Sequence, residues 1–169
     1  MIFRSASEAI RWAYAMNSGD PFAPRVDGGV MVDRAYQSAV KGRILALCAS
    51  VSTAHDIWLR WAYSEMATDK EIELFTVFCQ AQTLVGKWEG KKYSPEVVRA
   101  EVKSARSAYT ANPMRPYDIY DSLGLNTNQR KSYKRDWGGL TDSVKSLIDR
   151  IDREGLEPVA RWVYKQREA

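Results

Sequence analysis

The chain has 169 residues, a formal net charge of +4 and an apolar fraction of 45%, the composition of an ordinary globular protein. No apolar run reaches the roughly 18–20 residues that a membrane span needs, and the N-terminus lacks the apolar core and cleavage site of a signal peptide. We therefore expect a cytosolic protein that forms one domain or two small ones.

Residues suited to metal binding or catalysis are few. Cys48 and Cys79 lie far apart within apolar stretches, which predicts two buried free thiols and disfavours a disulfide framework or a zinc site. The single histidine, His55, has no nucleophile motif around it, and we expect it at a helix start or on the surface. The sequence also lacks a Gly-rich phosphate loop. We predict no cofactor, no metal site and no enzymatic activity.

Apolar residues recur with a period near 3.6, and few segments alternate as a strand would, so the predicted fold is all-α with about eight or nine helices. A first helix, capped by Ser5 or Ser7, is expected to end at Met16. The segment 16–29 contains three Gly and two Pro and is predicted to be a loop. A long helical stripe follows over 30–51.

Three further helix starts carry capping residues. Ser52 or Thr53 is predicted to start one helix. Thr68, three residues before Glu71, fits a capping box. The helix that follows Thr68 is apolar on more than one face, so we predict it to be the central helix of the domain. Ser94, followed by proline, is predicted to be the N-cap of the third helix.

That third helix is expected to run to about Tyr109, and Asn112-Pro113 excludes its continuation. We place a boundary between two sub-domains here. The prediction is a helical N-terminal body over 1–112 and a C-terminal region containing a helix-turn-helix over 113–169.

The helix-turn-helix is predicted within the stretch YDIYDSLGLNTNQRKSYKRDW. A short helix over 117–123 is followed by Gly124, where a tight turn needs a positive φ. Asn126 or Thr127 then caps a second helix. Tyr133 and Trp137 of this helix are expected to point inward, and its polar side chains outward.

Basic charge is concentrated on the second helix. Between residues 126 and 137 four cations accompany one anion, Asp136, whereas acidic residues outnumber basic ones over 141–157. The first turns of such a helix reach base edges in the major groove, where Asn and Gln suit adenine and Arg and Lys suit guanine or phosphate. The predicted DNA-binding residues are Thr127, Asn128, Gln129, Arg130, Lys131, Lys134 and Arg135.

A second interpretation of this stretch stays open. Tyr120 stands where a helix-turn-helix usually has a small residue, and Arg130 stands where it usually has an aliphatic one. A capped helical hairpin with a solvated basic face would have the same pattern. A second basic cluster over 87–106 could extend a DNA footprint, but its three glutamates favour a solvated face with ion pairs.

Two amphipathic helices are predicted after the Gly138-Gly139 pair, over 140–151 and 156–163. We expect them to belong to the core or to form the seam of a homodimer.

The segments SASEAIRWAYAM and LGLNTNQRKSYKRDWGGLTDSVKSLIDRID together resemble the late-gene antitermination proteins of lambdoid phages, the Q proteins, and related prophage regulators. The resemblance covers about the last third of the chain, with some support at the N-terminus. It implies a transcription regulator in the cytoplasm of a bacterial host cell. Such a protein binds double-stranded DNA near a late promoter and then acts on RNA polymerase so that terminators are ignored.

The resemblance also has consequences for individual residues. Some members of the family carry a zinc-binding cysteine cluster that this sequence lacks, so the implied protein is of the metal-free kind. Carried over by position, the DNA contacts of the family fall on the seven predicted residues between Thr127 and Arg135.

Two functions of other classes remain open. The small subunit of a phage terminase, which acts in DNA packaging, uses a similar helix-turn-helix but normally places it at the N-terminus. A helical adaptor or inhibitor of a host protein would use exposed aromatic side chains, and the chain has six Trp.

Overall fold

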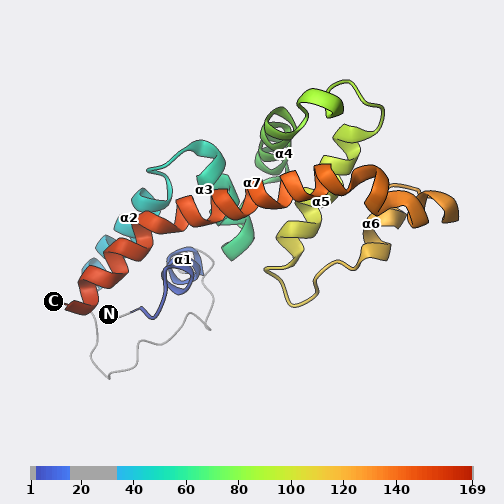
Figure 1. Cartoon of the computed structure of the whole chain (residues 1–169). Coiled ribbons are helices and arrows are strands. Elements are labelled where there is room, and N and C mark those ends of the chain that lie inside the picture. Colours follow the sequence, from blue (N-terminus) through green and yellow to red (C-terminus); the bar gives the residue numbers. More distant parts are fainter. Residues whose placement is uncertain (1–2, 16–33, 169) are drawn as a thin grey trace. The chain divides into compact units, whose positions relative to one another are not determined.

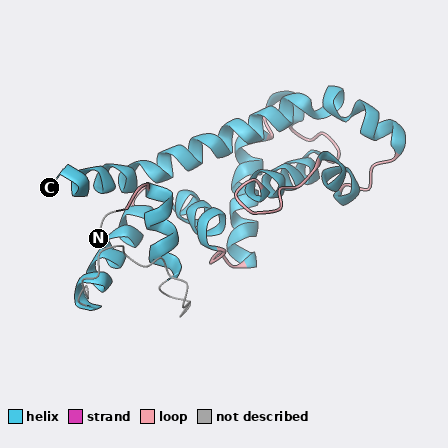
Figure 2. Cartoon of the chain, turned by 90° about the horizontal axis from the view of Figure 1, so that it is seen from below, coloured by secondary structure: helices cyan, strands magenta, loops and turns pink. Residues whose placement is uncertain are grey.

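The structure is a computed structural model that describes residues 3–15 and 34–168. In these ranges the chain is helical and contains no strand, which confirms the predicted all-α class (Figures 1 and 2). The predicted loop over 16–29 and the start of the predicted helix over 30–51 lie outside the described residues. The helices are α1 (Ala6–Ala15), α2 (Arg34–Cys48), α3 (Thr53–Ser64), α4 (Asp69–Thr83), the short 3₁₀ helix η1 (Gly86–Trp88), α5 (Ser94–Ser107), α6 (Pro116–Ser122) and α7 (Thr127–Glu168).

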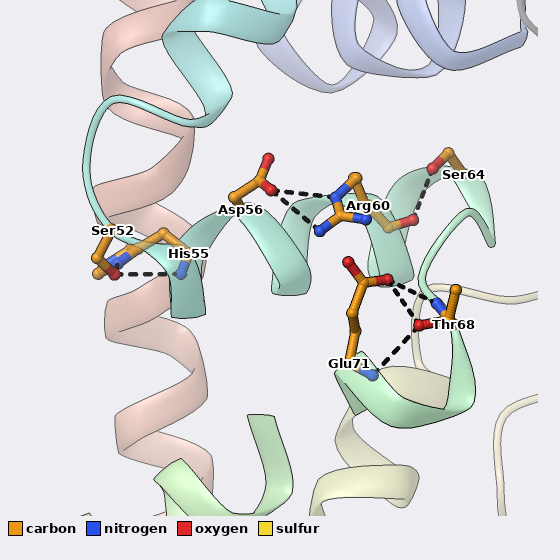
Figure 3. A network of polar contacts seen from close by, with 7 residues as sticks. All are labelled: Ser52, His55, Asp56, Arg60, Ser64, Thr68 and Glu71. Atoms are coloured by element: carbon orange, nitrogen blue, oxygen red, sulfur yellow. Dashed lines mark hydrogen bonds and ion pairs between the residues drawn. The ribbon is translucent and has the colours of Figure 1, made fainter. Parts of the chain in front are cut away.

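The starts of α3 and α4 confirm two of the predicted caps (Figure 3). The Ser52 hydroxyl oxygen accepts a hydrogen bond from the backbone N–H of His55 at 3.4 Å. At α4, Thr68 Oγ1 accepts from the Glu71 N–H at 3.3 Å, and the Glu71 carboxylate accepts from the Thr68 N–H at 2.8 Å. Each bond satisfies an N–H that has no partner within the helix.

The predicted N-cap at Ser94 is wrong by one residue. Tyr93 precedes α5 in a left-handed conformation with φ 69°, and it makes no side-chain capping bond. Ser94 is already helical and buried. Its hydroxyl donates to the carbonyls of Trp88, at 3.1 Å, and Lys91, at 2.7 Å, because a buried hydroxyl needs a partner that water cannot supply.

The chain divides into two compact units. The first unit comprises Met1–Ala67 and Ile151–Ala169, and the second comprises Thr68–Arg150. The predicted boundary at residue 112 therefore falls inside the second unit. There the N–H of Met114 donates to the Ser107 hydroxyl at 2.8 Å, which links the two sides of Pro113. α5 ends at Ser107, before the proline, and the packed unit continues beyond it.

In the first unit, α1, α2, α3 and the C-terminal part of α7 bury an apolar core that includes Ile10, Ile44 and Trp58. Asp152 on α7 accepts hydrogen bonds from Trp58 Nε1 and from the Tyr63 hydroxyl, both at 2.9 Å. These bonds fix α7 against α3, because the buried Trp58 and the half-buried Tyr63 donate to the same carboxylate.

In the second unit, α4, α5, α6 and the N-terminal part of α7 supply the core. α4 was predicted to be central, and this is wrong. Only one stripe of it, around Phe75 and Cys79, is fully buried, while Leu74 and Val77 are 56% and 49% exposed. The helix whose apolar residues recur in the cores of both units is α7, which buries Leu140, Val144, Leu147, Ile148, Ile151, Val159 and Val163.

The predicted break at Gly138-Gly139 is also wrong, because α7 is one continuous helix of 42 residues (Figure 1). A Cβ at Gly139 would lie 3.4 Å from the Trp88 ring, and a Cβ at Gly155 would lie 3.3 Å from the Leu59 side chain. These two glycines therefore allow close approach and do not end the helix. Each costs about 1 kcal/mol relative to Ala, and burial of the α7 apolar residues outweighs that cost.

Candidate nucleic-acid interface

The predicted turn between α6 and α7 forms as expected. Gly124 has φ 63°, which a residue with a side chain rarely adopts. Asn126 caps α7: its Oδ1 accepts from the Gln129 N–H at 3.0 Å, and Gln129 Oε1 accepts from the Asn126 N–H at 2.9 Å. The structure thus places a short helix, a tight turn and a capped second helix at the predicted positions.

Arg130 holds this turn together. Its Nε donates to the Leu125 carbonyl at 2.9 Å, and its guanidinium lies 2.6 Å from the Asp121 carboxylate. Leu125, which follows the turn glycine, is half-buried. Of the seven predicted DNA-binding residues, Gln129 and Arg130 have their polar groups engaged within the turn, as a side-chain cap and a clamp.

The other five predicted residues are Thr127, Asn128, Lys131, Lys134 and Arg135, and all are exposed. They are spaced three, four and seven positions apart, so they gather on one side of the first turns of α7. Arg135 forms an ion pair with Asp136 at 3.0 Å but remains 80% exposed. Among the described residues, Lys131 and Lys134 have no ion-pair partner.

A pair of stacked indoles lies next to this basic segment. Trp88 and Trp137 stack with ring centroids 5.8 Å apart and an interplanar angle of 22°. The ammonium of Lys91 lies 4.7 Å from the Trp88 ring centroid and 4.2 Å from that of Trp137, and Lys87 covers Trp88 at 4.7 Å. Trp137 was expected to point inward, and its ring is half-buried between the core and the lysines.

The second basic cluster therefore divides into two parts. Lys87 and Lys91 join the surface formed by α7, and Lys91 Nζ also lies 3.5 Å from the Asp136 carbonyl. Arg99 instead pairs at 2.7 Å with Glu73 of α4, which is not one of the three glutamates of the cluster. The Arg99 guanidinium lowers the pKa of the Glu73 carboxyl through this hydrogen bond. The close spacing of two aromatic residues and two lysines in WEGKKY is the sequence signal that indicates the part of the cluster next to α7.

A cavity of about 620 Å³ opens between the start of α5, the α6–α7 turn and the first turns of α7. Lys91, Gln129, Asp136 and Trp137 are among its lining residues. Hydrogen bonds from Ser132, and then from Arg135, lower the pKa of the Asp136 carboxyl. The basic surface thus contains one ionised carboxylate, which is held in place by its neighbours.

The chemistry that this surface offers is cationic and hydrogen-bonding. In the described part of the chain, no group of three metal-ligating side chains occurs. None of the described helices is long and apolar enough to cross a membrane.

His55 lies in the first unit at the start of α3, as predicted. Its Nδ1 lies 2.6 Å from the Ser52 hydroxyl oxygen, and its Nε2 lies 3.0 Å from the Glu154 carboxylate.

Comparisons of the chain with protein-family models, with curated proteins and with solved structures found no match.

Proposed function

We propose that this protein binds double-stranded DNA through the α6–α7 turn and the first turns of α7, as a helix-turn-helix. The observation that carries the proposal is the state of Lys131 and Lys134. Both are exposed on the same helical segment, and within the described residues neither is neutralised by an ion pair. Exposed cations without an ion-pair partner on a capped helix suit a polyanion, because their contacts with phosphates release the counterions condensed on the nucleic acid.

The side chains of this segment have different proposed roles. Gln129 and Arg130 hold the turn, as their hydrogen bonds indicate. Asn128, Lys131 and Arg135 have the chemistry to read base edges in the major groove. The backbone N–H groups at Thr127 and Asn128, at the start of a helix, suit a phosphate.

A second element adds charge beside the first. Lys87 and Lys91 carry their ammonium groups over the stacked indoles of Trp88 and Trp137, next to Lys134 and Arg135 in the same unit. The indoles restrict the lysines without neutralising them, since a cation–π contact is weaker than an ion pair with a carboxylate. We propose that these lysines contact phosphates and carry no sequence information.

For the biological role, the resemblance to phage antitermination proteins supports a regulator of phage or prophage transcription. In this proposal DNA binding brings the protein to a late promoter, and RNA polymerase is its second partner. An in vitro transcription assay with a terminator downstream of the promoter tests this step. Read-through that requires both the protein and its DNA site is expected, and termination that the protein leaves unchanged would refute the role in antitermination.

One observation favours a different function, that of a protein-binding adaptor. Leu74 and Val77 of α4 are exposed. Exposed apolar side chains on one helix are a common basis of protein recognition.

The experiment that tests DNA binding compares two double variants of equal net charge. Lys131→Ala/Lys134→Ala removes the two α7 lysines that have no ion-pair partner. Lys70→Ala/Lys165→Ala removes two exposed lysines elsewhere. Binding to labelled promoter fragments is measured over a series of salt concentrations. Each lost phosphate contact should lower the slope of log K against log salt by about 1, and each lost base contact should cost about 1–3 kcal/mol.

The two outcomes are distinct. Weakened binding in the first variant, with binding close to that of the unmodified protein in the control, supports the proposed interface. Equal effects of both variants would show that binding follows net charge alone. In that case the α7 surface would not be a recognition site.

A further inference from the structure

A second cavity, of about 630 Å³, lies in the second unit on a different side of α7. Residues of α5, α6 and α7 line it, together with the segment before α6. Its volume is within the range of small-molecule sites. The lining residues that matter here are Glu101, Ser104, Met114, Ile119, Tyr120 and Tyr133.

A buried carboxylate forms part of the cavity wall. Glu101 is 2% exposed, and its Oε1 accepts hydrogen bonds from the Tyr133 hydroxyl at 2.8 Å and the Thr141 hydroxyl at 3.1 Å. Among the described residues no group donates to Oε2, and no cation pairs with this carboxylate. Lys134 and Lys145 also line the cavity but form no ion pair with it.

Glu101 lines the cavity, and its Oε2 has no donor among the described residues. No sealed side-chain nitrogen or oxygen in the described part of the chain lacks a hydrogen-bond partner, so Oε2 is not completely sealed. A carboxylate removed from water costs several kcal/mol unless a cation or enough hydrogen bonds compensate. Two neutral hydroxyl donors on one oxygen compensate only in part.

The walls around this carboxylate suit an organic cation. The rings of Tyr120 and Tyr133 lie 5.2 Å apart with an interplanar angle of 59°, and both line the cavity. Aromatic faces attract ammonium groups, and the adjacent Met114 and Ile119 side chains offer apolar surface to a hydrocarbon chain. Burial, and then the charge of Glu101, raise the pKa of Tyr133, so its hydroxyl remains a proton donor to the carboxylate.

We propose that this cavity binds a small alkylammonium ligand, with the ammonium group at Glu101 Oε2 and the hydrocarbon part against Met114 and Ile119. The site goes beyond the proposed DNA binding and does not depend on it. Its key residue, Glu101, lies on α5 and belongs to neither the α6–α7 turn nor the basic face of α7. Glu101→Gln should therefore leave DNA binding intact.

The test uses matched charged and neutral probes. Hexylammonium and phenethylammonium chloride, with 1-hexanol and 2-phenylethanol as neutral counterparts, are titrated into the ¹⁵N-labelled full chain. Amide chemical shifts are followed. The ammonium probes should cause saturable shifts in the segments around Glu101 and Tyr133. The alcohols should bind about tenfold more weakly, because they carry no positive charge to pair with the carboxylate.

Three variants locate the site. Glu101→Gln keeps the shape and the acceptor for Tyr133 but removes the charge, and it should weaken ammonium binding about tenfold. Glu96→Gln makes the same change at an exposed position of the same helix and should bind as the unmodified protein does. Ser104→Leu fills the cavity from α5 and leaves the carboxylate of Glu101 in the sequence, and it should abolish binding even if Glu101→Gln does not fold.

The proposal would be overturned by alcohols that bind as well as the ammonium probes. It would equally be overturned by ammonium binding that survives in Glu101→Gln or Ser104→Leu, or by the absence of any saturable shift with either ammonium probe.

Discussion

The guanidinium of Arg130 lies 2.6 Å from the carboxylate of Asp121, so a side chain of α7 closes the turn that follows α6. The same side chain donates to the Leu125 carbonyl at 2.9 Å. An arginine that the sequence places among base-reading residues therefore uses two of its N–H donors within the protein. This relationship changes what a substitution at this position measures.

Arg130→Ala should destabilise the second unit by about 1 kcal/mol, and any loss of DNA affinity should follow from a loosened turn. The expected loss of stability is small because the Arg130 and Asp121 side chains are 33% and 65% exposed, and solvent screens their attraction. Urea unfolding of Arg130→Ala, Asp121→Ala and the double variant measures the coupling. Additive effects of the two single substitutions would contradict the predicted interaction.

Trp88→Ala should cost more stability than Trp137→Ala. Trp88 is buried and Trp137 is half-buried, so we expect losses of about 3–5 and about 2 kcal/mol. The stacked pair should add a coupling of about 0.5–1.5 kcal/mol in a double-mutant cycle followed by thermal unfolding. Trp61→Phe serves as a control for loss of an indole outside the pair. Equal costs at the two positions would show that Trp137 is as deeply packed as Trp88.

Two glycines of α7 should respond to alanine in opposite directions. At Gly138 the nearest atom to an added Cβ is Lys134 Cγ at 3.9 Å, so Gly138→Ala should stabilise the protein by about 0.5–1 kcal/mol through helix propensity. At Gly155 the Cβ would meet the buried Leu59 side chain at 3.3 Å. We expect Gly155→Ala to cost about 1–2 kcal/mol.

Chemical denaturation of both variants checks the sign of each effect. A helix that ended at Gly138-Gly139 would not gain stability from alanine there. Stabilisation by Gly138→Ala is therefore also evidence for the continuity of α7.

Cys48 and Cys79 should resist thiol reagents in the folded protein. Burial raises the pKa of each thiol from 9.0 to about 12, so neither is ionised near neutral pH. Ellman's reagent at pH 8 should react with both only after denaturation. Fast reaction in the native protein would show that at least one thiol is accessible.

The same pKa shifts predict a direction of pH dependence. The thiols ionise more easily in the unfolded chain, so their contribution to stability is present below about pH 9 and is lost as the pH rises from 9 toward 12. A variant with both cysteines replaced by alanine should lose less stability over this interval than the unmodified protein does. Identical pH profiles of the variant and the unmodified protein would contradict the predicted rise in the pKa of the two thiols.

The sequence by itself determined the features that depend on residues at most four positions apart. The caps at Ser52, Thr68 and Asn126 formed where predicted, because a capping side chain bonds an N–H two or three residues ahead. The helical period and the positive φ of Gly124 are local in the same sense. The all-α class follows from these signals together.

Tertiary structure alone decided the features in which distant residues meet. Gly138-Gly139 resembled a helix end, and only the burial of Tyr133 and Leu140 on either side of the pair shows why α7 continues through it. Arg130 resembled a base reader until Asp121 was placed beside it. Glu101 was counted with the solvated acids, although it occupies a buried position of α5. The physical reason is common to all three: spacing along a helix fixes which side chains share a face, but only packing against other elements fixes whether that face meets water, a carboxylate or a ring.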